Sequence, residues 1–240
     1  MSKDSLEYPV LKNTSVVDSV KDFIVDQLIK GNLRPGDKLP TEAEFCANLN
    51  AGRNSVREAI KQLEAQGVVY IKRAEGTYIS DSYDPKMLSP VLYSLIMQQS
   101  NWRDFVDLRK TLDIGSLYIV AEKGISEGGK VKLKAALDRL ESCISESNPD
   151  PRKINDADCN FHTIITELTE NPQLKTICDF INQLTIPSRI ETTAMVVASG
   201  DIKDYGRLHR QLYDIIVNSN KFEIENAVVN HYVFWEKRNS

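Results

Sequence analysis

Apolar side chains recur every three to four residues in the first third of the chain, which is the spacing of helices that bury one face. This pattern predicts three helices, over residues 16–29, Glu42–Leu49 and Arg53–Gln66. Thr41 and Glu44 have the spacing of a capping box at the start of the second helix, and Gly67 is suited to end the third. Only a short turn separates the second and third helices, which is the helix-turn-helix pattern.

Two short strands are predicted after the third helix. Val68–Ile71 and Thr77–Ser80 are rich in β-branched and aromatic residues, and the turn residues Lys72–Gly76 separate them. Three helices followed by a hairpin indicate a winged helix.

The remainder of the chain has a helical pattern throughout. Residues 81–86 are polar and include Pro85, which predicts a linker. Seven helices are expected beyond it, over Met87–Gln98, Trp102–Lys123, Glu127–Ser147, Arg152–Glu170, Leu174–Val197, Ile202–Ser219 and Lys221–Lys237. Short connections between them predict an antiparallel bundle. The expected fold is therefore mainly α, with a winged helix-turn-helix domain over residues 10–80 and an all-helical domain over residues 87–238.

The net charge of −4 does not announce a nucleic-acid partner, so any DNA-binding signal must be local. Residues 53–73 carry a net charge of +3, which leaves −7 on the rest of the chain. Arg53, Arg57 and Lys61 are spaced by four, so they share one face of the third helix. In a major groove, arginine reads guanine edges and lysine pairs with phosphate. The alternative is a solvated basic surface, and the adjacent turn and basic hairpin favour the DNA interpretation.

The chain shows no signal sequence and no apolar run of membrane-spanning length, so a cytoplasmic protein without membrane contact is expected. Its four cysteines lack the CxxC spacing of a metal or redox motif. They are interpreted as small buried hydrophobic residues.

Three separated motifs in the first eighty residues resemble the GntR family of transcription regulators. They are LRPGDKLPTE at 33–42, RNSVREAIKQLEAQG at 53–67 and EGTY at 75–78. The resemblance implies that Arg53 and Arg57 are the main contacts of a recognition helix, with Asn54 and Ser55 at its start and Gly76 at the wing tip. Arg34 and Lys61 complete the predicted DNA-binding residues.

Two positions depart from this family's pattern. Gly52 stands where a serine or threonine usually caps the recognition helix, and glycine offers no hydroxyl to the helix or to a phosphate. Ala43 stands where some members carry a DNA-contacting arginine. DNA binding is still expected, but these departures leave the operator sequence open.

The chain has only three histidines, and each is on a different predicted helix of the second domain. Asp158 precedes His162 by four residues, which places both on one helical face. Together with His209 and His231 they offer one carboxylate and three imidazoles, a donor set that suits zinc, nickel or another divalent ion with coordination positions left open. Taken alone, the same residues could also be ordinary surface or core histidines.

Further motifs resemble the FCD domain, the ligand-binding domain of FadR-type regulators. They are DCNFH at 158–162, LHRQLYDII at 208–216, AVVNH at 227–231, and RKTLD at 109–113, with aspartate in place of the usual glutamate. The resemblance implies that Asp158, His162, His209 and His231 hold the metal and that Arg109 faces the same cavity. Arg189 is a second candidate for the effector, with a surface salt bridge as its alternative role.

These expectations combine into one functional hypothesis. A homodimer binds a pseudo-palindromic operator in double-stranded DNA, and a small organic acid at the metal site changes the affinity, most simply by releasing a repressor. Two alternatives use the same residues. One is a helical metalloenzyme, although no general base or nucleophile motif accompanies the metal donors. The other is a regulator whose metal is purely structural.

Overall fold

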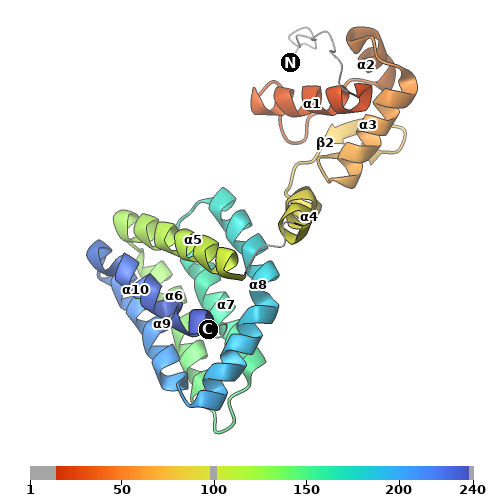
Figure 1. Cartoon of the computed structure of the whole chain (residues 1–240). Coiled ribbons are helices and arrows are strands. Elements are labelled where there is room, and N and C mark those ends of the chain that lie inside the picture. Colours follow the sequence, from red (N-terminus) through yellow and green to blue (C-terminus); the bar gives the residue numbers. More distant parts are fainter. Residues whose placement is uncertain (1–14, 98–101, 238–240) are drawn as a thin grey trace. The chain divides into compact units, whose positions relative to one another are not determined.

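The computed structural model describes residues 15–97 and 102–237 (Figure 1). Contacts divide the chain into two compact units, Met1–Gln98 and Gln99–Ser240. The first contains a helix-turn-helix with a two-stranded hairpin, and the second is helical, so the predicted fold class is confirmed. No helix in the described ranges is long and apolar enough to span a membrane. Some residues of the predicted elements and domains lie outside the described ranges, namely residues 10–14, Gln98 and residue 238.

Three helices and a hairpin form the first unit: α1 (Val16–Ile29), α2 (Glu42–Leu49), α3 (Arg53–Ala65), β1 (Val69–Lys72) and β2 (Gly76–Ile79). Helix α3 packs on both α1 and α2, and their apolar faces bury a core that includes Phe23, Phe45, Val56 and Leu63. The opposite face of α3 is left to its charged residues. The basic face of α3 is therefore exposed to solvent.

The turn between α2 and α3 is set by local chemistry. The Thr41 side chain accepts from the Glu44 backbone, and the Glu44 carboxylate accepts from the Thr41 N–H at 2.7 Å, which completes the predicted capping box. Asn50 ends α2 in the left-handed conformation, with φ of 50°. Gly52 is the N-cap of α3 and makes no side-chain cap bond.

The hairpin pairs antiparallel, with Tyr70 opposite Tyr78 and Lys72 opposite Gly76. The two tyrosine rings stack with centroids 5.7 Å apart, and the Lys72 ammonium lies 5.0 Å from the Tyr78 ring centroid. Gly76 has φ of 124°, a conformation that residues other than glycine rarely adopt. These contacts connect the two strands of the wing, and Gly76 begins β2 directly after the turn.

The segment after the hairpin stays close to the first unit. Ser80 Oγ donates to the Gly67 carbonyl at 2.5 Å, and Asp84 packs so tightly on Gly67 that a Cβ there would lie 2.9 Å from the Asp84 Cβ. A 3₁₀ helix (Pro85–Leu88) and α4 (Ser89–Met97) follow. Contacts group these elements with the first unit, whereas the sequence interpretation placed the domain boundary at residues 81–86.

The second unit contains five long helices and a divided C-terminal segment. The long helices are α5 (Trp102–Lys123), α6 (Glu127–Ile144), α7 (Pro151–Leu168), α8 (Pro172–Ser199) and α9 (Ile202–Val217). The segment predicted as one helix over Lys221–Lys237 is instead η3 (Lys221–Glu223), α10 (Ile224–His231) and α11 (Val233–Lys237). The helical pattern continues across the break at Tyr232, which explains why the sequence did not reveal it.

Helix α7 lies between α6 and α8 and has two different buried faces (Figure 1). Its apolar face includes Ile154, Ala157, Phe161 and Ile165, which are buried in the hydrophobic clusters of the unit. Its other buried face is polar and is matched by polar residues of α8, including Thr185, Arg189, Thr192 and Thr193. Such groups are retained inside a protein only where they are hydrogen-bonded or paired. The interior of the second unit therefore contains a polar seam.

The cap of α3 gives a stability prediction. Replacing Gly52→Ser should stabilise the helix by roughly 0.5–1 kcal/mol, because serine supplies a cap acceptor and restricts the unfolded chain. A Cβ at Gly52 meets nothing closer than Ser55 Oγ at 4.0 Å. Slower hydrogen exchange of the α3 amides would report the gain. Gly67→Ser is the control, and should destabilise because of its φ of 79° and its contact with Asp84. Unchanged or faster exchange in the Gly52 variant would contradict the account of this cap.

Candidate functional site

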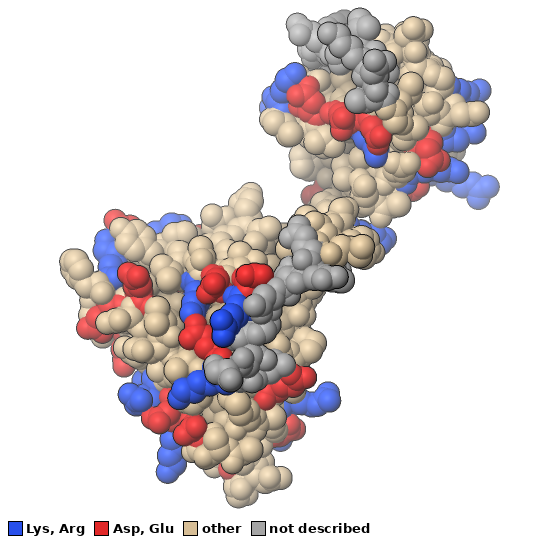
Figure 2. All heavy atoms as spheres, viewed as in Figure 1, with Lys and Arg blue, Asp and Glu red and all other residues tan. Residues whose placement is uncertain are grey.

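The basic face of α3 is exposed. The side chains of Arg53 and Arg57 are 77% and 51% accessible, and Lys61 continues the same face. Glu42, at the start of α2, lies 3.2 Å from Arg57 Nη2 and 3.8 Å from Arg53 Nε. Exposed ion pairs of this kind contribute little free energy, so phosphate or base edges can replace Glu42 at small cost. Lys and Arg side chains project from the edge of the unit that carries α3 (Figure 2).

The other predicted DNA-binding positions are also in the first unit. Asn54 is exposed and Ser55 half-buried in the first turn of α3, and Gly76 is exposed at the wing tip. Arg34 is exposed in the loop before α2, where its backbone N–H donates to Asp37 Oδ2 at 2.8 Å. The structure places these residues at the surface and leaves their DNA contacts as a prediction.

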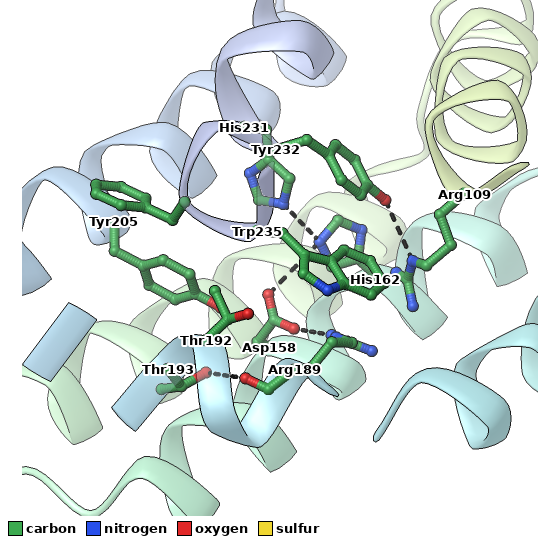
Figure 3. Close-up of a pocket in the computed structure, with 11 residues that line it drawn as sticks. Arg109, Asp158, His162, Arg189, Thr192, Thr193, Tyr205, His231, Tyr232 and Trp235 are labelled. Atoms are coloured by element: carbon green, nitrogen blue, oxygen red, sulfur yellow. Dashed lines mark hydrogen bonds and ion pairs between the residues drawn. The ribbon is translucent and has the colours of Figure 1, made fainter. Parts of the chain in front are cut away.

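The four predicted metal ligands come together in the second unit. Figure 3 labels Asp158, His162 and His231 of this set. Each offers one donor atom, and these atoms lie within 4.8 Å of one another. His162 Nε2 is 3.0 Å from His231 Nε2, and Asp158 Oδ1 is 2.5 Å from His209 Nε2 and 3.6 Å from His162 Nε2. Ligand atoms about 2.1 Å from a single ion lie roughly 3 to 4 Å from one another. The cluster therefore has about the dimensions of a coordination shell.

Backbone and carboxylate partners orient two of these imidazoles. His209 Nδ1 lies 2.9 Å from the Tyr205 carbonyl, an acceptor, so this nitrogen carries the proton and Nε2 holds a lone pair. His162 Nδ1 lies 3.3 Å from the Asp113 carboxylate, which fixes its tautomer in the same way. The lone pair of His209 then faces Asp158 Oδ1, a second acceptor. Two acceptors at 2.5 Å call for a cation or a proton between them.

Burial keeps the imidazoles of His209 and His231 neutral. It lowers the pKa of His209 to about 3, and the nearby His162 adds to the effect. Burial, followed by the proximity of His209 and His162, also holds the pKa of His231 well below its ordinary value. Neutral imidazole is the form that binds metals, so no proton has to be displaced from these two rings at neutral pH.

Asp113 connects the cluster to Arg109. Burial acts to raise the pKa of Asp113, but His162, Arg109 and the hydroxyl of Tyr232 outweigh it and hold the pKa below its usual range. Tyr232 Oη donates to Asp113 Oδ2 at 2.6 Å and accepts from Arg109 Nε at 3.2 Å. A buried chain of charge-assisted hydrogen bonds thus runs from Arg109 through Tyr232 and Asp113 to His162.

Arg189 is buried beside Asp158, which excludes a surface salt bridge as its role. Its Nη2 pairs with Asp158 Oδ2, and its Nη1 lies 3.4 Å from Asn182 Oδ1, which also accepts from Arg109 Nη1. Burial and the like charge of Arg109 lower the pKa of Arg189 to about 9, so both guanidinium groups remain charged at neutral pH. Two cations that share one amide oxygen form a favourable environment for an anion.

A pocket adjoins this cluster, with about 390 Å³ of empty space that includes space open to solvent. It is lined by three of the predicted ligands, both arginines and a set of threonine and aromatic side chains: Arg109, Asp158, His162, Arg189, Thr192, Thr193, Tyr205, His231, Tyr232, Phe234 and Trp235. His209 completes the cluster of ligands and is fully buried. Sequence reasoning missed Asn182, Tyr232 and Trp235. The only available signal was the proximity of two aromatic residues to His231 in the sequence.

Comparison with known protein families assigns both units. Residues 16–79 match the model of bacterial regulatory proteins of the gntR family, and residues 104–234 match the FCD domain. The first match describes regulatory proteins, and neither match describes an enzyme. The expectation that this chain is not an enzyme agrees with these matches.

Individual relatives agree with this assignment. The chain is 26% identical to the HTH-type transcriptional regulator LutR of Bacillus subtilis (strain 168), over 84% of this chain and 90% of that protein. It is 26% identical to the galactonate operon transcriptional repressor of Escherichia coli (strain K12), over 66% of this chain and 69% of that one. A Streptococcus agalactiae GntR structure is 23% identical, has a TM-score of 0.58 and aligns with 93% of this chain and 100% of its own. The chain therefore belongs to the GntR family of transcription regulators, as a FadR-type member with an FCD domain.

Proposed function

We propose that this regulator binds its operator through α3 and the wing, as a homodimer in the cytoplasm, and that a small organic acid in the FCD cavity controls the affinity. The observation that carries the DNA half is the exposed pair Arg53 and Arg57 on a helix whose other face is fully buried. The observation that carries the sensing half is the convergence of four metal donors and two arginines on one cavity.

A divalent metal, with zinc as the first choice, is the proposed resident of the cluster. Three borderline imidazole nitrogens together with one carboxylate oxygen suit zinc or nickel. The lone pair of His209 facing the Asp158 carboxylate supports a cation there, because two acceptors otherwise repel each other. When bound, the ion would offer open positions to a carboxylate of the effector.

Both arginines are proposed to neutralise and orient the acid. Arg109 and Arg189 line the cavity, and guanidinium binds carboxylate through two parallel hydrogen bonds. A relative named for the galactonate operon supports a hydroxylated acid as the effector class. That relative is also named as a repressor, which supports release of a repressor by its effector.

Regulation requires that the acid bind two conformations of the regulator with different affinity. A difference of about 1.4 kcal/mol changes operator affinity only tenfold. Effector contacts join α5, α7, α8 and the C-terminal segment, because Arg109, Asp158, Arg189 and Trp235 come from these four elements. In the proposed mechanism, a change in their packing alters how the two DNA-binding units of the dimer meet the operator half-sites.

Removing both arginines of α3 should abolish specific DNA binding. The double variant Arg53→Ala, Arg57→Ala loses base contacts worth about 1–3 kcal/mol each, which corresponds to at least about 30-fold weaker operator binding. Electrophoretic mobility shifts at two salt concentrations would measure it, and thermal stabilisation by zinc should be unchanged. The matched control replaces two exposed arginines of the second unit, Arg139→Ala and Arg207→Ala. Specific binding retained in the first variant would refute the role of α3.

The zinc content of the protein should depend on the four donor residues and on the residues that orient them. His231→Ala should eliminate stoichiometric zinc, measured by mass spectrometry of dialysed protein. Asp113→Asn keeps all four donors but weakens the hydrogen bond that orients His162, and should reduce zinc affinity about 10- to 100-fold. Asp179→Asn, at a half-exposed carboxylate paired with Lys175, is the control and should bind normally. One zinc per chain retained in the His231 variant would exclude this site.

Acid should destabilise the metal-free protein. Unfolded His209 takes up a proton near pH 6.5, whereas in the folded state its pKa is about 3, so the unfolded chain binds more protons between these values. The contribution of His209 to the free energy of unfolding is therefore fully present above pH 6.5 and is lost as the pH falls. Between pH 7.5 and 5.5 the loss should be about 1.4 kcal/mol for His209, with a similar contribution from His231.

Chelator-treated protein unfolded in urea at the two pH values would measure this loss. His209→Gln should reduce the pH dependence by about half. Equal stability at both pH values would mean that the imidazoles are not held neutral by burial.

A further inference from the structure

The indole of Trp235 carries a polar atom that the site described above leaves unused. Its Nε1 is buried and has no hydrogen-bond partner among the described residues, and the whole residue is only 7% exposed. A buried donor without a partner is unfavourable, because it has lost its hydrogen bonds to water. Trp235 lines the cavity of Arg109 and Arg189, and its ring faces that space in Figure 3. An unsatisfied donor in this position indicates a partner that arrives with the ligand.

Neighbouring side chains fix the orientation of this indole. Tyr232 stacks on it with centroids 5.8 Å apart and planes at 21°, and the Arg109 guanidinium lies 5.9 Å from its centroid. The adjacent Glu236 pairs with Lys110, the neighbour of Arg109 on α5. The contacts of Trp235 with Arg109 and of Glu236 with Lys110 connect α11 to the same turn of α5. The indole N–H is therefore held in place before a ligand binds, which lowers the entropic cost of using it.

The polar lining of the cavity contains several strong hydrogen-bond donors. Arg109 and Arg189 contribute guanidinium groups, and Trp235 contributes an N–H. One oxygen of the Asp158 carboxylate is paired with Arg189, and the other lies 2.5 Å from His209 Nε2. The hydroxyls of Thr192 and Thr193 donate to carbonyls of their own helix at 2.9 Å, which leaves their oxygens free to accept. A complementary ligand must therefore present several acceptor oxygens.

We propose that the Trp235 N–H binds a second oxygen of the effector, one that lies beyond the carboxylate held by the arginines, and that it thereby selects hydroxylated acids over simple ones. This inference rests on the proposed function, because it takes an organic acid to be the ligand of the cavity. It adds a specificity-determining residue on α11, a segment of five residues that supplies a wall of the site. Phe234, beside it, provides an apolar surface for the carbon chain of the acid.

Matched pairs of acids with equal charge test this proposal on the full-length, zinc-loaded protein. The probes are glycolate with acetate, D- and L-lactate with propionate, and D-galactonate with hexanoate. Binding is measured by calorimetry in the wild type and in Trp235→Phe, which keeps the ring and removes the N–H. We expect at least one hydroxylated acid to bind the wild type about three- to tenfold more tightly than its partner, and this preference to disappear in the variant.

Indole resonances in ¹H–¹⁵N spectra provide a second measurement that needs no change at the site. The chain has two tryptophans, and Trp102→Phe identifies the signal of Trp235. That signal should shift when the preferred acid binds. An unmoved Trp235 signal, with the same preference in Trp235→Phe, would overturn the inference and leave the proposed function standing. If none of the acids binds, the proposed effector class itself is wrong.

Discussion

The Asp158 carboxylate is the buried charge on which the second unit depends. One of its oxygens lies 2.5 Å from His209 Nε2, and the other pairs with Arg189. Removing a partner from such a buried pair costs roughly 3–5 kcal/mol, because the remaining charge stays out of water without compensation. The ion pair between Asp158 on α7 and Arg189 on α8 holds the polar seam between these helices together. A cation between Asp158 and His209 would add the charge that their facing lone pairs require.

The arginines of the two units have opposite environments. In the first, Arg53 and Arg57 are exposed and share only the exposed carboxylate of Glu42, so another anion can take its place. In the second, Arg109 and Arg189 are buried and held by oxygens of Asn182, Tyr232 and Asp158. An exposed cation suits a polyanion such as DNA, whose counterions are released on binding. A buried cation in a small cavity suits one small acid with matching oxygens.

Sequence reasoning was most successful where a local pattern decides the structure. Helices α1 to α3, the capping box at Thr41 and the basic face of α3 follow from apolar spacing and cap chemistry within a few residues. The proposed metal donors were predicted from three histidines, a carboxylate one turn before the first, and motifs that resemble the FCD domain. The wall formed by α11 was not predictable, because the break at Tyr232 interrupts a continuous helical pattern and turns Tyr232 and Trp235 toward Arg109. No sequence pattern predicted the role of Asn182 either, because that role depends on the packing of α5 against α8.

Anomalous X-ray diffraction from crystals of the zinc-reconstituted protein tests the central claim most directly. The account predicts a single strong peak at zinc's absorption edge, about 2.0–2.2 Å from a nitrogen of each of the three histidines and from an oxygen of Asp158. The peak should be accompanied by separation of Asp158 Oδ1 from His209 Nε2 beyond their present 2.5 Å. No peak in this cluster, with the carboxylate and imidazole still in direct contact, would contradict the metal site and with it the proposed sensor.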